Sequence, residues 1–200
     1  MAPRTQERAA AEREHLFRSA WAVLKRSGYA NASITEILAE AGISTRAFYR
    51  HFASKDDLLV AMFVENADVA AERVAARVAT ADTALARVEA WVDAILDLGY
   101  EARTRTSARL FASPAVRGVF EDAGQAAIAH LYAPLREALA DGLAAGELPT
   151  ADPANDAETI YSITWRLVLD QAQGRSGLSR EQAGVHVRRF VLAALGASPG

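Results

Sequence analysis

The chain has 200 residues, a formal net charge of −3 at pH 7 and hydrophobic side chains at 51% of its positions. That length and apolar content suffice for one compact body with a substantial core, or for two small ones. Cysteine is absent, which excludes a disulfide framework, a cysteine-based zinc site and a thiol redox switch. The sequence has neither an apolar run long enough for a membrane span nor a signal-peptide core, so we expect a cytoplasmic protein with no membrane partner.

The charges are unevenly distributed along the chain. Residues 1–55 carry nine Lys/Arg and five Asp/Glu, a net charge of +4, whereas residues 56–200 carry thirteen and twenty, a net charge of −7. A basic segment attracts phosphate, and an acidic one is repelled by nucleic acid. The imbalance predicts two parts with different partners, although a solvated surface without functional order could give the same totals.

The first predicted helix carries Phe17, Ala20, Trp21 and Leu24 at helical spacing and ends before Gly28. A second helix begins after Ser33, because Ser33 and Glu36 have the spacing of a capping box. It has room for about two turns before the next glycine.

A tight turn separates that helix from a third. Gly42 follows the last periodic residue, where a left-handed C-cap favours glycine, and Ser44 can cap a new helix two positions later. In the third helix Phe48 and Phe52 share one face, which predicts packing, while polar side chains lie on the other. Residues of about 32–51 therefore have the pattern of a helix-turn-helix, whose second helix can enter the major groove of DNA.

Three stretches of the sequence then resemble the tetracycline-repressor (TetR) family of transcriptional regulators: Gly42-Ile43-Ser44, Phe48-Tyr49-Arg50-His51-Phe52, and Ser54-Lys55-Asp56-Asp57-Leu58. The similarity in motif covers roughly residues 10–60, and the remainder resembles the family in size and helical character. It implies an all-α fold, with an N-terminal three-helix DNA-binding domain at 1–55, the head, and a larger ligand-binding and dimerisation domain at 56–200, the body.

The resemblance also implies roles for individual residues of the head. Thr45 and Arg46 become the candidates for base-edge contacts, because the first turn of a recognition helix points into the groove. Tyr49, His51 and Lys55 are expected to hold phosphates. The alternatives are that Tyr49 is mainly a packing residue and that His51 is a surface residue without a partner. Ala47 stands where the family often has Thr or Ser, so one hydroxyl contact is lost. The full set of expected DNA-binding residues is Thr35, Ser44, Thr45, Arg46, Tyr49, Arg50, His51 and Lys55.

The body is expected to be helical throughout, with helices at about 54–79, 82–100, 106–112, 116–145, 156–174 and 180–195. Ser179 and Gln182 form a second capping box before the last one. Pro134 lies inside the fourth of these helices and predicts a kink between His130 and Pro134, because proline removes a backbone donor and clashes with the preceding turn.

The body is also where a small-molecule inducer, apolar or aromatic in character, is expected to bind. The candidate contacts are Trp91, Phe111, His130, Tyr132, Tyr161 and Trp165, with Arg109 and Asp93 as further polar anchors. The alternative is that these aromatic side chains are core.

The last two helices are expected to pair with their copies in a homodimer, as the family implies and as a palindromic operator requires. The alternative is that their apolar faces close the monomer's own core. These expectations describe a nucleoid-associated repressor, without cofactor or metal, that binds a double-stranded DNA operator and is released by its inducer.

Three other functional classes stay in view. An enzyme is disfavoured because the sequence has no glycine-rich phosphate loop, no G-x-S-x-G and no H-E-x-x-H, and its four histidines are scattered. An architectural DNA-binding protein without a ligand would use the same head. An activator would too, because the sequence does not record where the polymerase binds.

Overall fold

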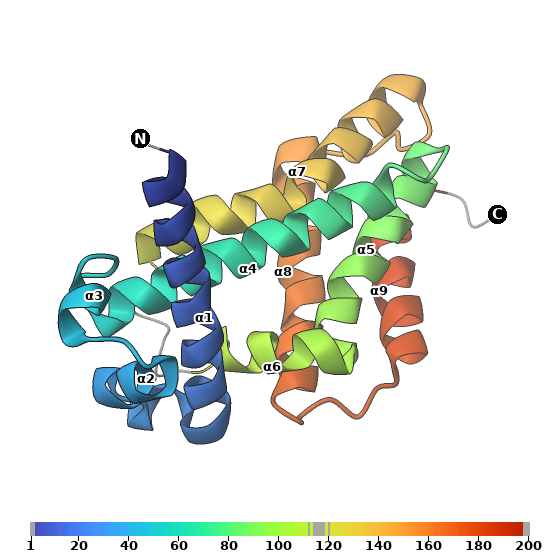
Figure 1. Ribbon diagram of the computed structural model, residues 1–200. Coiled ribbons are helices and arrows are strands. Elements are labelled where there is room, and N and C mark those ends of the chain that lie inside the picture. Colours follow the sequence, from blue (N-terminus) through green and yellow to red (C-terminus); the bar gives the residue numbers. More distant parts are fainter. Residues whose placement is uncertain (1–2, 112, 114–118, 120, 198–200) are drawn as a thin grey trace.

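The computed structural model describes residues 3–111, 113, 119 and 121–197. Within these residues the chain is helical and contains no strand (Figure 1), which confirms the predicted all-α fold. None of the helices in this part of the chain is both long and apolar enough to cross a membrane.

Three helices form the head: α1 (Pro3–Asn31), α2 (Ile34–Ala41) and α3 (Thr45–Tyr49). The first was expected to end before Gly28, and the chain does leave helical geometry there, with φ 72° and ψ 166°. A positive φ of this kind costs glycine little. Helical backbone resumes after it, so α1 continues past a sharp bend to Asn31.

Helix α4 (Lys55–Val78) runs from the head into the body (Figure 1). It begins where predicted, because the Ser54 side chain accepts a hydrogen bond from the Asp57 backbone N–H. Its first residues pack with the head, and its later ones pack against α5 and α7 of the body.

Five further helices complete the described part of the body: α5 (Ala84–Tyr100), α6 (Ala102–Phe111), α7 (Glu121–Ala145), α8 (Pro153–Ala172) and α9 (Arg180–Ala194). The predicted start of α6 at about residue 106 is wrong by four residues. The backbone turns at Glu101, whose carbonyl accepts hydrogen bonds from the N–H groups of Thr104 and Arg105. The first residues of the predicted 116–145 helix, 116–118 and 120, lie outside the described residues.

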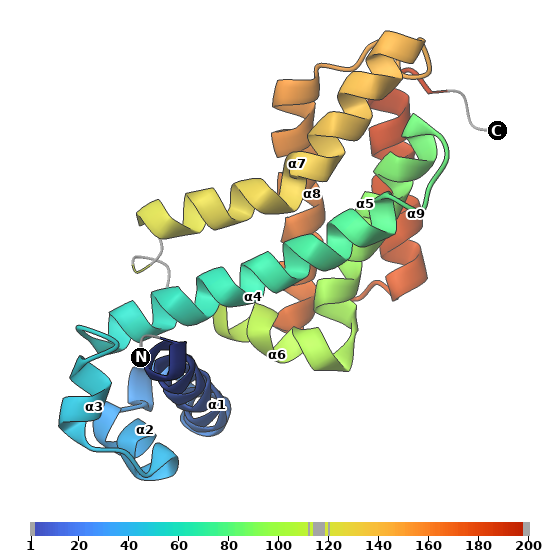
Figure 2. The same cartoon turned by 45° about the horizontal axis from the view of Figure 1, so that its top comes forward.

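Helix α7 changes direction along its length, as Figure 2 shows. Pro134 lies inside it and cannot donate to the carbonyl of His130, four residues earlier. Close to that point the indole N–H of Trp91 donates to the Leu131 carbonyl at 2.8 Å. The predicted kink therefore lies beside a buried contact between α5 and α7.

The buried apolar side chains form two clusters, one in the head and one in the body. The head cluster surrounds Phe48 and Phe52 and extends along α4 to Met62. A domain boundary at residue 55 stays a prediction, since three α4 residues beyond it, Leu58, Leu59 and Met62, pack with the head.

Charged side chains join α4, α5 and α9 at the surface of the body. Asp97 accepts from Arg77 at 2.6 Å and from Arg180 at 2.5 Å, and Asp93 accepts from Arg180 and Arg188. Burial alone would lower the pKa of Arg180, but the hydrogen bonds to the two aspartates raise it. Asp93 is thus engaged in packing α9, and its expected role as a ligand anchor stays a prediction.

Candidate DNA-binding surface and ligand cavity

The helix-turn-helix has the caps that its sequence predicts. In the capping box the Ser33 hydroxyl accepts from the Glu36 N–H, and the Glu36 carboxylate accepts from the Ser33 N–H at 2.8 Å. These hydrogen bonds hold the pKa of Glu36 below its ordinary value. Gly42 ends α2 in the left-handed conformation, φ 64°, and the Ser44 hydroxyl caps α3 by accepting from Ala47.

Aromatic packing fixes the orientation of α3. Phe48 is fully buried and its ring centroid lies 5.8 Å from that of Phe52, which stacks on Phe17 of α1 at 5.7 Å. The face with these rings is therefore held against α1 and α4, and the opposite face is turned to solvent.

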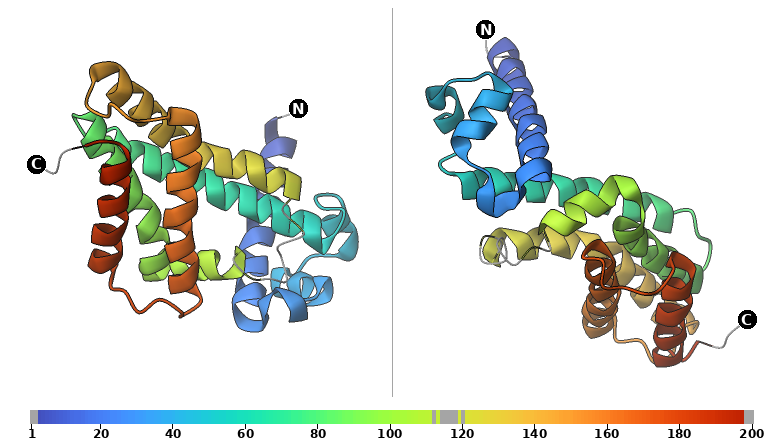
Figure 3. Two further views of the ribbon diagram at one scale, coloured as in Figure 1. Left: turned by 180° about the vertical axis from the view of Figure 1, so that it is seen from behind. Right: turned by 90° about the horizontal axis from the view of Figure 1, so that it is seen from below.

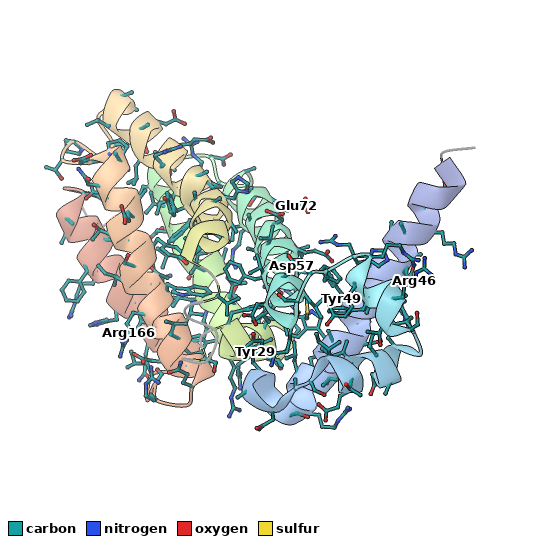
Figure 4. The ribbon with its side chains drawn as sticks, turned by 90° about the vertical axis from the view of Figure 1, so that its left-hand side faces the viewer. Tyr29, Arg46, Tyr49, Asp57, Glu72 and Arg166 are labelled. Carbon is teal, nitrogen blue, oxygen red and sulfur yellow. The ribbon has the colours of Figure 1, made fainter. Side chains whose placement is uncertain are left out.

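The solvent face of the helix-turn-helix carries Thr35, Ser44, Thr45, Arg46 and Tyr49, all exposed. Tyr49 has 54% of its surface accessible, although its ring also meets Phe48 edge-on. Arg46 makes no hydrogen bond or ion pair with any residue of the described chain. Figure 4 places Arg46 and Tyr49 on the head, across the molecule from Arg166 of α8. These side chains are available to a partner.

Arg50 and His51 are engaged with Glu12 of α1. The Arg50 guanidinium donates to both Glu12 carboxylate oxygens, at 2.7 and 2.6 Å, and His51 Nε2 lies 3.3 Å from Glu12 Oε2. Burial acts to raise the pKa of Glu12, but the contacts with His51 and Arg50 outweigh it, so the pKa is lowered. The His51 side chain is only 10% exposed, whereas that of Arg50 remains 61% exposed.

Lys55 is also occupied within the chain. Its ammonium donates to the carbonyls of Tyr29 and Ala32 at 3.0 and 2.9 Å, and it lies 4.2 Å from the centre of the Tyr29 ring. The Tyr29 hydroxyl in turn donates to Asp56. Burial and that acceptor raise the pKa of Tyr29. Lys55 therefore ties the start of α4 to the end of α1.

A cavity of about 280 Å³ lies between α4, α6, α7 and α8. Its walls are mostly apolar and include four aromatic side chains, Phe63, Phe111, Tyr161 and Trp165. The rings of Tyr161 and Trp165 stack at 5.8 Å, and those of Phe63 and Phe111 meet edge-on at 5.0 Å. The volume is close to the lower end of small-molecule sites, about 300–1,000 Å³.

Of the six predicted ligand contacts, Phe111, Tyr161 and Trp165 line this cavity. The expectation that Trp91, His130 and Tyr132 share it is wrong. Trp91 is fully buried in the core, His130 is exposed and lies 3.4 Å from Asp68, and Tyr132 packs behind Tyr161 at 5.8 Å. Arg109 lies on the other side of α6, facing α1. Periodicity assigned each residue to a helix but could not tell which helices enclose the hollow.

A lining residue of the cavity is in direct contact with the head. Phe111, at the end of α6, lines the cavity and meets the ring of Trp21 of α1 edge-on at 5.6 Å. Trp21 packs against the head cluster. A change in the cavity that moves Phe111 would therefore act on α1.

Helices α8 and α9 are neighbours in the body (Figure 3), and the C-terminal end of α8 reaches the groove beside the end of α1, which Ala172 helps to line. They and the loop between them leave several large apolar side chains exposed: Ile163 at 42%, Leu178 at 37%, Val185 at 57% and Phe190 at 54%. Large apolar side chains left exposed in neighbouring elements are candidates for a protein contact.

Residues 16–62 match the model of the family described as bacterial regulatory proteins, tetR family. This stretch carries a TetR-family DNA-binding domain. The matched stretch begins in α1, contains the helix-turn-helix and ends in α4, at the last residue of the head cluster. It confirms the resemblance read from the same residues of the sequence, and the chain is a DNA-binding transcription regulator.

The TetR-family assignment agrees with the fold of the whole chain. A TetR-family transcriptional regulator from Mesorhizobium loti superposes with a TM-score of 0.75 at 19% identity, covering 94% of this chain and 97% of that one. The regulator FadR from Bacillus subtilis, solved with stearoyl-CoA, gives 0.75 at 16% identity, covering 90% and 98%. A regulator from Saccharomonospora viridis, solved with choline, gives 0.69 at 23%, covering 91% and 96%. At these identities the likeness shows the fold alone.

Sequence reasoning on this TetR-family chain missed the residues that hold the DNA-binding surface in place. Glu12, Tyr29 and His15 contact residues 26 to 38 positions away, and His15 Nε2 donates to the Ala41 carbonyl at 2.9 Å. No local pattern marks such pairs. The sequence predicted the excess of basic residues in the head, but it did not predict that Arg50 and Lys55 make contacts within the chain.

Proposed function

We propose that this TetR-family regulator is a homodimeric repressor that binds a palindromic operator through α3 and is released by a small-molecule inducer in the α4–α8 cavity. The observation that carries the proposal is Phe111, which is shared between the cavity wall and the contact with Trp21 of the head. Ligand binding can shift DNA affinity only if it favours one arrangement of the two parts over another.

For the DNA contacts we assign base reading to Thr45 and Arg46, and phosphate contact to Tyr49, Thr35 and Ser44. Support comes from their exposure and from the first-turn position of Thr45 and Arg46 on α3. Arginine bonds guanine in bidentate fashion, and a threonine methyl can contact thymine.

Arg50, His51 and Lys55 remain part of the proposed DNA-binding surface, and they also stabilise the head through contacts within the chain. Each has a contact inside the chain, with Glu12 or with carbonyls at the end of α1. Arg50 is exposed enough to reach a phosphate while paired. His51 and Lys55 contribute mainly by holding α3 and the α4 N-terminus in register.

The inducer site is supported by the shape and chemistry of the cavity, which has apolar walls with a few polar groups among them. The solved neighbours with bound ligands hold stearoyl-CoA in one case and choline in another, which differ in size and charge. The class of ligand has to be inferred from the cavity of this chain itself.

The homodimer is supported by the exposed apolar residues of α8, α9 and their connecting loop. One recognition helix covers too few base pairs for a unique site, and a two-fold dimer places two of them about 34 Å apart on a palindrome. Helix α9 lies across the body from the head (Figure 3), so a contact through it leaves both heads free to meet DNA.

Selection of bound duplexes from a random DNA library by the purified protein tests this function. We expect convergence on a palindrome whose half-sites lie about one helical turn apart. A reporter gene carrying the selected site should then be silenced by the protein. A selected pool without a shared sequence would contradict operator binding, and increased reporter output would contradict repression.

A further inference from the structure

The described part of the cavity wall carries positive charge. Among the lining residues that the structure describes, Arg73 of α4 is the one cationic side chain, and there is no aspartate or glutamate. Arg73 is exposed and makes no hydrogen bond or ion pair with any residue of the described chain. One turn further along the same helix, Arg77 is paired with Asp97 at 2.6 Å. Arg73 is therefore the lining residue that can neutralise an anion.

The position of Arg73 is at the mouth of the cavity. Ala70, Arg73, Leu98 and Thr104 line both the cavity and a groove on the adjoining surface. The aromatic side chains of the cavity do not line that groove. A ligand with its apolar part among the rings can thus reach Arg73 with its outer end.

The nearby carboxylates do not cancel this charge. In the groove, Asp97 is held by Arg77 and Arg180, and Glu101 by Arg103 at 2.5 Å. On α4 itself, Asp68 lies 3.4 Å from His130, and neither it nor Glu72 lines the cavity. Within the described wall a cationic ligand would meet aromatic faces but no carboxylate, and it would be repelled by Arg73.

We infer that the cavity takes an amphiphilic anion, a compact hydrocarbon body ending in a carboxylate that pairs with Arg73. The inference rests on the proposed ligand response and specifies its chemical class. Asn66 and Ser107 also line the cavity and have no hydrogen bond within the described chain, so they can bond the same polar end. Thr104 is less available, because its hydroxyl donates to the carbonyls of Asp97 and Glu101.

Three ten-carbon probes that differ only in the head group test this inference: decanoate, 1-decanol and decyltrimethylammonium. Binding to the full-length protein is measured by tryptophan fluorescence, because Trp165 lines the cavity. We expect decanoate to bind about tenfold or more tightly than either other probe, which is the effect of one charge-assisted hydrogen bond. Equal binding of the three probes, tighter binding of the cation, or no binding of decanoate would overturn the inference.

Variants at position 73 identify the charge responsible. Arg73→Gln should reduce decanoate affinity about tenfold and leave decanol affinity unchanged, and Arg73→Lys should restore part of the preference. Arg136→Gln is the matched control, because Arg136 is also exposed and unpaired within the described chain but lines no cavity described here. Unchanged decanoate affinity in Arg73→Gln, with a normal melting curve, would overturn the assignment.

Operator binding, measured in the same samples, separates this inference from the proposed function. Decanoate binding through Arg73 without any change in DNA affinity would contradict the inducer mechanism and leave the ligand class standing. Release of DNA by decanol or by the cation, but not by decanoate, would support an inducer mechanism and overturn the anionic class.

Discussion

Arg46 and Arg50 are four positions apart in the sequence but have different surroundings. Arg50 is held by both carboxylate oxygens of Glu12, whereas Arg46 extends from the first turn of α3 with no partner in the described chain. An arginine already paired within the protein gains less from a base than a free one does. The difference supports the proposed base-reading role of Arg46.

Replacing Arg46 by alanine should therefore cost about 1–3 kcal/mol of binding free energy on the selected operator and relax the preference at one base position. Titration of the variant on operator and scrambled duplexes measures both effects. Arg136→Ala, on α7 of the body, should bind like the unmodified protein. If Arg46→Ala lost the same binding free energy on both duplexes, Arg46 would be a phosphate contact and not a base contact.

Glu12 should make stability depend on pH. Its pKa is lowered in the folded protein below the ordinary 4.5, so its contribution is fully present above that value. The contribution is lost as the pH falls through the lower, folded-state pKa. We expect Glu12→Gln to cost about 1 kcal/mol or less near pH 7, because Arg50 is largely exposed, and to cost nothing at low pH.

Urea denaturation of both proteins across the acid range measures this difference. Glu14→Gln is the control, because Glu14 has only a 4.0 Å contact with the exposed Arg18. A difference between Glu12→Gln and the unmodified protein that stays constant as the pH falls would show that the carboxylate charge is not responsible.

Local chemistry determined most helix boundaries at the element scale. Ser33, Ser54 and Ser179 cap the helices that follow them, and Gly42 ends α2, as the sequence predicts. These signals act within four residues and can be read from a single chain. The start of α6 was missed because the turn at Glu101 uses backbone carbonyls, with no capping side chain to mark it.

The turn of the helix-turn-helix depends on the conformation of Gly42. A Cβ at this position would meet nothing within 4 Å, so Gly42→Ala should be destabilising only through its positive φ, by about 1–2 kcal/mol. Gly177→Ala is the matched control, because that glycine is equally open but has no positive φ. Similar unfolding free energies for the two variants would mean that the turn conformation carries no strain.

Cavity membership was beyond what the sequence could predict. Phe111, Tyr161 and Trp165 belong to the cavity, while Trp91 is equally aromatic and lies in the core, with its indole N–H bonded to Leu131 beside the bend at Pro134. The distinction depends on how α4, α6, α7 and α8 cross, which no helical pattern encodes. Arg73 was missed for the same reason, because an exposed arginine on a long helix looks like any surface charge.

At the scale of the whole molecule, the proposed mechanism needs contact between the cavity and the head within one chain. It also needs a second copy of the chain that holds the two heads at a defined spacing. The Phe111–Trp21 contact joins cavity and head within one chain, and the exposed residues of α8 and α9 offer the surface for a second chain. Helix α9 lies across the body from the head, so in the proposed dimer a ligand-induced movement can change the spacing of the two heads (Figure 3).

Placing a charge on that surface should separate the copies without unfolding the chain. Phe190 is 54% exposed, so Phe190→Glu should yield a folded monomer in sedimentation at micromolar concentration, with much weaker operator binding. Leu143→Glu, at a 42% exposed site on α7, should stay dimeric. A Phe190→Glu protein that still sediments as a dimer would remove α9 from the interface.

Fluorescence anisotropy of the purified protein on its selected operator and on a scrambled duplex, at two salt concentrations, measures whether DNA binding is specific. We expect a preference of about 10³ or more for the operator, with affinity for both duplexes falling as salt rises. Weak and equal binding to both duplexes, lost at the higher salt, would contradict it and leave only a non-specific basic head.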